Sequence, residues 1–208
     1  MTQQFLPSEF DDWADSYDAS VRIDTAFPFD GYDLVLEAIL KDAAVSPGNF
    51  VLDLGAGTGN LSALFLERGC RVWGVDFSIK MLEHAQEKLP QAVFAQADVR
   101  EALPADFPQR YHAVVSGYTF HHFPLEEKVR LVQRIVNDYL LPGGRLVIGD
   151  LMFRDAADED VLRQKMGEEW EQEYFWLADE SLAALAKAGI SARFIKCSSC
   201  AGVLTVSA

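Results

Sequence analysis

The 208-residue sequence has few cysteines, and they are poorly placed for a metal or a disulfide framework. Cys197 and Cys200 form one C-x-x-C pair, Cys70 stands alone, and the four histidines lie far from the pair in sequence. A four-ligand zinc site needs more ligands than this pair supplies, so no metal site is expected. A redox C-x-x-C normally opens a helix. This one lies between two strand-like runs, which indicates ordinary turn cysteines.

Positive charge is also scarce, since 18 lysines and arginines face 32 aspartates and glutamates, for a formal charge of −14. Such a surface repels nucleic acid unless a basic stripe compensates, and no stripe occurs, so no nucleic-acid partner is expected. No apolar stretch approaches the ~20 residues that span a bilayer. The chain does not open with a basic region followed by an apolar one. We therefore expect a cytoplasmic protein without a membrane partner; the sequence leaves its oligomeric state open.

Strand-like and helix-like runs alternate through the middle of the chain. The predicted strands are residues 50–54, 71–76, 92–96, 112–116 and 145–149, and the predicted helices between them are 61–68, 79–88 and 126–139. This alternation favours an α/β fold with a doubly wound, mostly parallel sheet covered on both faces. The length suits one domain over residues 1–208, with a helical amino-terminal part (1–45) and a core (50–208).

The two ends of the chain add to this plan. An amphipathic helix is predicted over residues 8–18, with Phe10, Trp13, Ala14 and Tyr17 on one face, and a second helix over 30–45. After the alternating region we expect an acidic, aromatic helix at about 158–176 and another at 180–187. The runs 192–196 and 202–206 are close enough to form an antiparallel hairpin.

A glycine-rich turn between the first strand and its helix predicts a cofactor cradle. The strand carries Asp53 near its end, and Gly55, Ala56 and Gly57 follow in the turn. Glycine permits positive φ and close backbone approach to a ligand, and a helix N-terminus presents open N–H groups. We expect all four residues to contact the cofactor. A dinucleotide turn has a third glycine where Asn60 stands, so the spacing disfavours NAD.

Two further acids point to a nucleoside. Asp76 ends the second strand and can accept hydrogen bonds from both ribose hydroxyls, or cap the following helix. Phe77 can pack on an adenine face, and Ser78 is predicted to be the N-cap. Asp98 follows the third strand, where it can accept a hydrogen bond from the adenine amino group beside the Val99 backbone. A chance loop aspartate is the alternative for Asp98.

Taken together, these motifs make the chain resemble the class I S-adenosylmethionine-dependent methyltransferases, in particular their small, mostly uncharacterised bacterial members. The matching segments are residues 51–60, 75–78 with 81–82, 96–99, 113–122 and 141–149, and residues 10–18 resemble the lid helix of many small members. The resemblance covers nearly the whole chain. It implies S-adenosylmethionine as cofactor and a Rossmann-like seven-stranded sheet in the order 3-2-1-4-5-7-6, with one antiparallel strand.

The resemblance also suggests roles around the methyl group. The backbone at Ser116 is expected to touch the methionine part of the donor. Trp13 and Tyr17 are expected to close over the donor, where an aromatic face attracts a sulfonium; packing against the core is the alternative. His121 or His122 is a candidate general base near neutral pH, although a structural histidine in this loop would look the same. We take both histidines and Tyr17 as the catalytic candidates.

The acidic and aromatic run at residues 168–176 is expected to shape the acceptor pocket. An aromatic and acidic wall would suit a cationic or amine acceptor, whereas a solvated acidic face is the simpler interpretation. We expect methyl transfer to a small-molecule acceptor by in-line displacement. The alternatives are a donor-binding sensor without catalysis, a protein or tRNA methyltransferase, and an NAD-dependent oxidoreductase, which the turn and Asp98 disfavour.

Overall fold

The structure is a computed structural model that describes residues 7–23 and 26–208. The extreme amino terminus, over which no signal peptide is predicted, lies outside these residues. The first helix is α1 (Pro7–Ile23). Several of its side chains also lie outside the described part of the chain, among them Phe10, which was predicted to lie on the apolar face. A second helix, α2 (Tyr32–Asp42), leads to the sheet.

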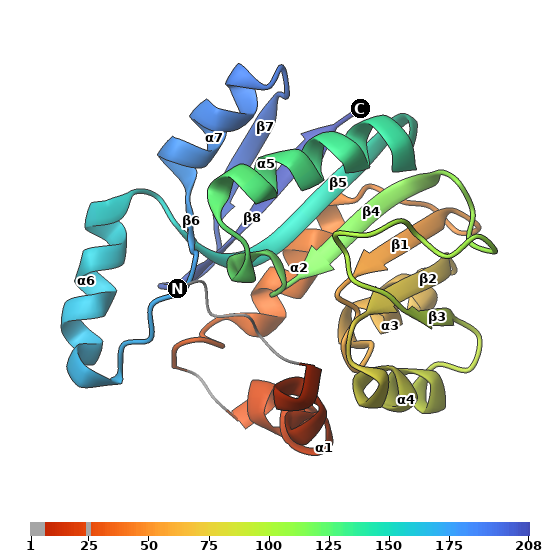
Figure 1. Ribbon diagram of the computed structural model, residues 1–208, viewed down its shortest axis with the longest axis horizontal. Helices are drawn as coiled ribbons and strands as arrows, with labels where there is room; N and C mark the ends of the chain where they lie inside the picture. Colours follow the sequence, from red (N-terminus) through yellow and green to blue (C-terminus); the bar gives the residue numbers. More distant parts are fainter. Residues whose placement is uncertain (1–6, 24–25) are drawn as a thin grey trace.

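The sheet has the predicted topology. Its strands are β1 (Phe50–Leu54), β2 (Arg71–Asp76), β3 (Val93–Gln96), β4 (Tyr111–Gly117), β5 (Leu140–Phe153), β7 (Ala192–Lys196) and β8 (Ala201–Ser207). They lie in the order β3-β2-β1-β4-β5-β8-β7, and β8 runs antiparallel to both neighbours (Figure 1). The short β6 (Trp176–Leu177) pairs with β5 outside this path. With β6 set aside, the order is the expected 3-2-1-4-5-7-6.

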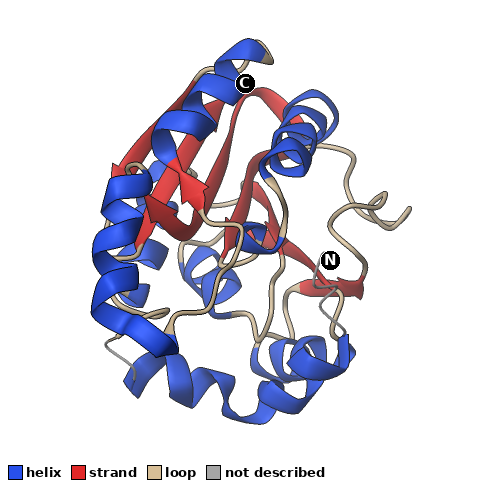
Figure 2. Cartoon of the chain, turned by 60° about the vertical axis from the view of Figure 1, so that its left-hand side comes forward, coloured by secondary structure: helices blue, strands red, loops and turns tan. Residues whose placement is uncertain are grey.

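Helices cover both faces of the sheet (Figure 2). They are α3 (Asn60–Glu67), α4 (Ile79–Lys88), α5 (Leu125–Arg134), α6 (Ala156–Met166) and α7 (Ala178–Lys187). Alternate strand residues feed two apolar clusters: Val51 packs with α2 and α3, whereas Leu52 packs with α5 and α7. Both faces of the parallel sheet are therefore buried. None of the helices within the described residues is long and apolar enough to cross a bilayer.

The acidic, aromatic helix predicted at 158–176 is wrong beyond Met166. There α6 ends, and the next residue, Gly167, has a φ of +59° that suits glycine and breaks the helix. A 3-10 turn, Gly167–Glu169, and an irregular stretch then lead to β6. The aromatic residues pack with a distant segment instead of along one helix face. Trp170 stacks on Phe27 with ring centroids 5.3 Å apart, and Phe175 meets Phe27 at 6.1 Å.

Strand β5 is longer than predicted, because the proline-glycine-glycine segment forms a bulge within it. Leu140 lies opposite Tyr111, and Arg145 lies opposite Ala113, so residues 141–144 face a single residue of β4. At the carboxyl terminus the structure confirms the β7–β8 hairpin. The cysteines Cys197 and Cys200 lie in its turn, and both are free thiols.

Candidate functional site

A cavity of about 850 Å³ opens at the carboxyl ends of the central strands. Its volume is typical of sites for small molecules. The walls come from the glycine turn, α1, the ends of β2 and β3, the loop after β4, and the segment 166–174. Chain segments far apart in sequence therefore meet where an open α/β sheet normally binds its ligand.

The glycine turn forms one end of this cavity. Gly57 lines it with a φ of +52°, and no atom lies within 4 Å of the position that a Cβ would take. The backbone here is therefore open to a ligand. Gly55 also lines the cavity, and a Cβ on it would collide with the side chain of Thr119. Glycine is needed at both positions, at the first for access and at the second for packing.

Asp76 links the glycine turn to the next helix. Its Oδ2 accepts a hydrogen bond from the Gly57 N–H and its Oδ1 one from the Ser78 N–H, both at 2.9 Å. Burial raises the pKa of Asp76, while these backbone hydrogen bonds oppose the rise. The hydroxyl of Ser78 in turn accepts the Met81 N–H at 3.2 Å, which confirms the predicted N-cap. Asp76 thus faces the cavity from a fixed position.

Three predicted contact residues lie beneath the cavity instead of on its wall. Asp53 is 1% exposed and accepts a hydrogen bond from the Ser62 hydroxyl at 2.7 Å. Burial raises its pKa to about 7. Ser116 is fully buried and donates to the Leu54 carbonyl at 2.6 Å. Ala56, the third of these residues, borders with Asp53 a void of about 30 Å³ that shares Gly55 and Gly57 with the cavity.

Asp98 lines the cavity together with Phe77 and Val99, the residues expected at an adenine-binding end. Its carboxylate is already held by Arg100, whose Nε lies 2.9 Å from Oδ1 and whose Nη2 lies 2.5 Å from Oδ2. Burial acts to raise the pKa of Asp98, but Arg100 outweighs it and holds the pKa below its usual value. The ionised carboxylate remains an acceptor for a further donor.

The lid helix covers the cavity with Trp13 and Tyr17, whose ring centroids are 4.9 Å apart in an edge-on arrangement. Burial raises the pKa of Tyr17 well above its ordinary value, so the phenol is neutral. The next residue, Asp18, fastens α1 to the glycine turn. Its carboxylate accepts hydrogen bonds from Thr58 Oγ1 at 2.5 Å and Asn60 Nδ2 at 2.9 Å. Sequence reasoning did not identify this role of Asp18. Its place at the end of the predicted helix was the one feature that could have indicated it.

The two predicted histidines lie together at the other end of the cavity. His121 and His122 form a 3-10 turn after β4, with ring centroids 4.0 Å apart. His121 Nδ1 lies 2.5 Å from Oδ1 of the fully buried Asp150. Trp176 Nε1 donates to Asp150 Oδ2 at 3.2 Å, and the Leu151 N–H donates to Oδ1 at 2.8 Å. His121 and its carboxylate partner are thus held in one orientation.

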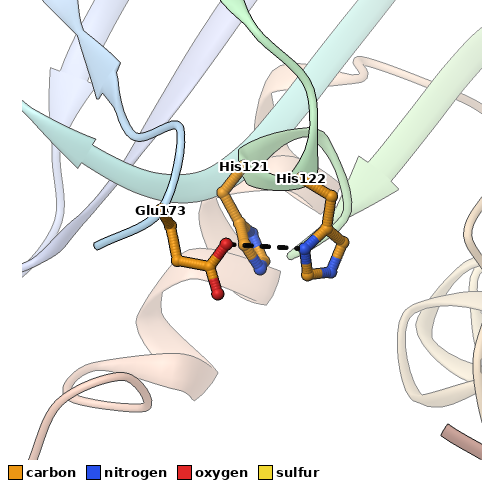
Figure 3. Close-up of side chains that lie close together, drawn as sticks. All are labelled: His121, His122 and Glu173. Atoms are coloured by element: carbon orange, nitrogen blue, oxygen red, sulfur yellow. Dashed lines mark ion pairs between the residues drawn. The ribbon is translucent and has the colours of Figure 1, made fainter. Parts of the chain in front are cut away.

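The second histidine faces the irregular segment after α6. His122 Nδ1 lies 3.8 Å from Glu173 Oε2. The side chains of His121, His122 and Glu173 turn towards one another (Figure 3). Burial and the neighbouring His121 lower the pKa of His122, which keeps its imidazole neutral near pH 7. Glu127, Glu169 and Glu171 also line the cavity. This end of the cavity is therefore acidic, and the imidazoles of His121 and His122 line it beside the glutamates.

The irregular segment is secured to the core through its main chain. The Tyr174 N–H donates to the His121 carbonyl at 3.0 Å, and the buried Lys128 Nζ donates to the Tyr174 carbonyl. Lys128 also lies 4.5 Å from the centre of the Trp176 ring. Burial lowers the pKa of Lys128 to about 8. Sequence reasoning did not identify Lys128, because a lysine on an amphipathic helix normally faces solvent.

Comparison with known proteins agrees with this geometry. Residues 51–144 match the model of a methyltransferase domain. An uncharacterised methyltransferase of Geobacillus kaustophilus is 35% identical over 206 residues, covering 93% of this chain and 92% of that protein. Another from Bacillus velezensis is 34% identical over 206 residues, with 93% of each covered.

Solved structures share the fold. A complex of DhpI with SAM and HEP has a TM-score of 0.71 at 22% identity, covering 96% of this chain and 94% of that one. Magnesium protoporphyrin IX methyltransferase of Synechocystis with bound SAH has a TM-score of 0.70 at 21% identity, covering 96% and 98%. With the relatives above one-third identity over nearly their full length, the chain belongs to the S-adenosylmethionine-dependent methyltransferases.

Proposed function

We propose that this protein transfers a methyl group from S-adenosylmethionine to a small-molecule acceptor bound beside His121 and His122. The observation that carries the proposal is the continuity of one cavity from the glycine turn to the two histidines. The donor would occupy the end with the turn, and the acceptor would occupy the end with the histidines. The lid helix closes over this space, which suits a small molecule better than a folded macromolecule.

At the donor end, the residues present fit the cofactor. The open backbone at Gly57 offers close approach, and Asp76 offers carboxylate lone pairs to ribose hydroxyls. Asp98 and Phe77 would hold the adenine. S-adenosylmethionine supplies an activated methyl group on a sulfonium whose leaving group is neutral. Tyr17 and Trp13 would cover that positive centre with aromatic faces, an attraction of about 0.5–2 kcal/mol.

At the acceptor end, the residues of the chain would align the acceptor with the methyl group and offer it imidazole and carboxylate groups as hydrogen-bond acceptors. Fixed placement of two reactants can supply at most about 7–11 kcal/mol of the barrier. His121, oriented by Asp150, and the neutral His122 present imidazole nitrogens to the acceptor, able to take its proton or to hold an ion. The glutamates around them favour an acceptor that carries positive charge.

Calorimetric titration with S-adenosylhomocysteine, with NAD as the control ligand, tests the donor end. We expect saturable one-to-one binding of the first ligand alone. An acceptor screen then follows, with amines, phenols, thiols and carboxylic acids, and acceptor-dependent formation of S-adenosylhomocysteine as the readout. Turnover only with protein or tRNA substrates would overturn the small-molecule assignment. Donor binding without turnover of any acceptor would favour the sensor instead.

A further inference from the structure

We infer that His121, His122 and Glu173 form a binding site for one divalent transition-metal ion at the acceptor end of the cavity. The three residues come from two separate segments, the turn after β4 and the irregular stretch before β6. Sequence spacing indicates no such site, because Glu173 is distant from the histidine pair in the chain. The fold brings the three side chains together (Figure 3).

The distances suit an ion after a small adjustment. One ligand atom from each residue lies within 4.8 Å of the other two. An ion of the zinc type binds nitrogen and oxygen at about 2.0–2.2 Å, so ligands on opposite sides lie about 4.2 Å apart and tetrahedral ones closer. The most distant pair therefore has to close by at most about 1 Å. Glu173, which lies on an irregular segment, can do this by rotation of its side chain.

His121 already has the support that metal-binding histidines usually have. Its Nδ1 contacts Asp150 Oδ1 at 2.5 Å, which leaves Nε2 as the nitrogen for an ion. A carboxylate behind the imidazole fixes the tautomer and raises the basicity of the ligating nitrogen. Asp150 is itself fully buried and held by Trp176 and Leu151. It therefore acts as a positioning residue for the site.

The other two ligands offer suitable atoms to an ion. His122 presents an imidazole nitrogen and Glu173 a carboxylate oxygen, and these atoms lie within 4.8 Å of each other and of a ligand atom of His121. The 3.8 Å between His122 Nδ1 and Glu173 Oε2 is shorter than the separation of about 4.2 Å between ligands on opposite sides of one ion. Glu127, Glu169 and Glu171 line the same cavity and make its potential favourable to a dication.

Two imidazoles and one carboxylate favour zinc, cobalt, iron or manganese over magnesium, which prefers oxygen ligands. Three protein ligands also leave coordination positions open, as in catalytic sites. If the proposed function holds, these positions face the acceptor. The acceptor would then carry an oxygen, nitrogen or sulfur donor atom, which the ion both positions and makes easier to deprotonate.

The test is an absorption titration of chelator-treated full-length protein with Co²⁺, in the absence of donor, followed by calorimetry with Zn²⁺. We expect one-to-one binding and the visible bands of Co²⁺ in a nitrogen and oxygen site. His122→Gln and Glu173→Gln should each weaken binding about tenfold or more, and Asp150→Asn about 10–100-fold. Glu171→Gln is the matched control, because it removes the same charge from the same cavity without removing a ligand.

Several results would overturn this site. They are the absence of saturable binding, affinity unchanged in both His122→Gln and Glu173→Gln, an equal loss in Glu171→Gln, or the near-ultraviolet band of a cobalt–thiolate bond. S-adenosylhomocysteine affinity, measured on the same samples, separates the two proposals. Intact donor binding in a variant that has lost the metal shows that it is folded. If the native protein does not bind S-adenosylhomocysteine at all, that result counts against the proposed function and not against the metal site.

Discussion

The carboxylate of Asp18, on the lid helix, accepts a hydrogen bond of 2.5 Å from the hydroxyl of Thr58, in the glycine turn. The same carboxylate contacts Lys88 Nζ at 2.7 Å. The Asp18 side chain therefore connects the lid helix to the glycine turn and to α4. Because the lid carries Trp13 and Tyr17 at the donor end, its attachment should matter for donor affinity.

We predict that Asp18→Ala loosens the lid and weakens binding of S-adenosylhomocysteine by about 1 kcal/mol, or about fivefold. Calorimetric titration measures the change. Asp15→Ala is the matched control on the same helix, because Asp15 is exposed and contacts only His84, at 3.0 Å, among the described ion pairs. Equal losses in the two variants would show that the Asp18 contacts do not hold the lid over the donor.

Asp76→Ala should weaken donor binding by about 1.5–3 kcal/mol, the range for hydrogen bonds to a charged group. The substitution removes the predicted ribose acceptor and also leaves the N–H groups of Gly57 and Ser78 without their partner. Titration of the folded variant measures the affinity, and thermal unfolding measures the structural part. An affinity equal to that of the native protein would remove Asp76 from the site.

Gly57→Ala should reduce donor affinity more than it reduces stability. The positive φ costs a non-glycine residue about 1–2 kcal/mol, and the new methyl group projects into open space on the cavity wall. Gly48→Ala is the control, since Gly48 has a φ of +84°, equally open surroundings and no place in the cavity. Both variants should lose similar stability, and only Gly57→Ala should bind the donor more weakly. Equal donor binding would contradict close approach at Gly57.

We expect the free energy of unfolding to depend on pH because of Asp53. Its folded pKa of about 7 lies above the unfolded value, so the folded state holds the proton between about pH 4 and pH 7 and the unfolded state does not. This residue's contribution to the free energy of unfolding therefore falls as the pH rises through that range, with a limiting slope of about 1.4 kcal/mol per pH unit.

Urea denaturation of the native protein and Asp53→Asn, at pH 4.5 and pH 7, checks this. The asparagine variant should gain stability relative to the native protein as the pH rises, because it carries no ionisable group beside Ser62. Comparing the two proteins cancels the opposite slopes of paired carboxylates such as Asp98 and Asp150, whose pKa values are lowered. A difference independent of pH would contradict the raised pKa.

Local patterns in the sequence were enough to predict the sheet and the cap of the helix after its second strand. Strand periodicity, glycine spacing and capping act over a few residues, so β1, β2 and the Ser78 cap are confirmed. The depth of side chains was not readable in the same way. Asp53 and Ser116 lie in the predicted strands β1 and β4, yet their side chains are buried and do not line the cavity.

The course of the chain over residues 167–176 depends on contacts between distant segments, and there the predicted helix is wrong. The residues around Trp170 have helical spacing, but the positive φ at Gly167 and stacking on Phe27 outweigh it. The pairing of His121 with Asp150 joins the 3-10 turn after β4 to strand β5. Sequence periodicity does not indicate contacts between distant segments, so the stacking on Phe27 and the His121–Asp150 pair are visible only in the folded structure.

The irregular stretch before β6 is held by the carbonyl and amide of Tyr174, which bond to Lys128 and to the His121 carbonyl. Neither bond depends on which side chain occupies position 174 or its neighbours. The side chains of this segment that line the cavity can therefore be exchanged while the course of the chain is preserved. Such exchanges would alter the shape and charge of the proposed acceptor end on a constant backbone.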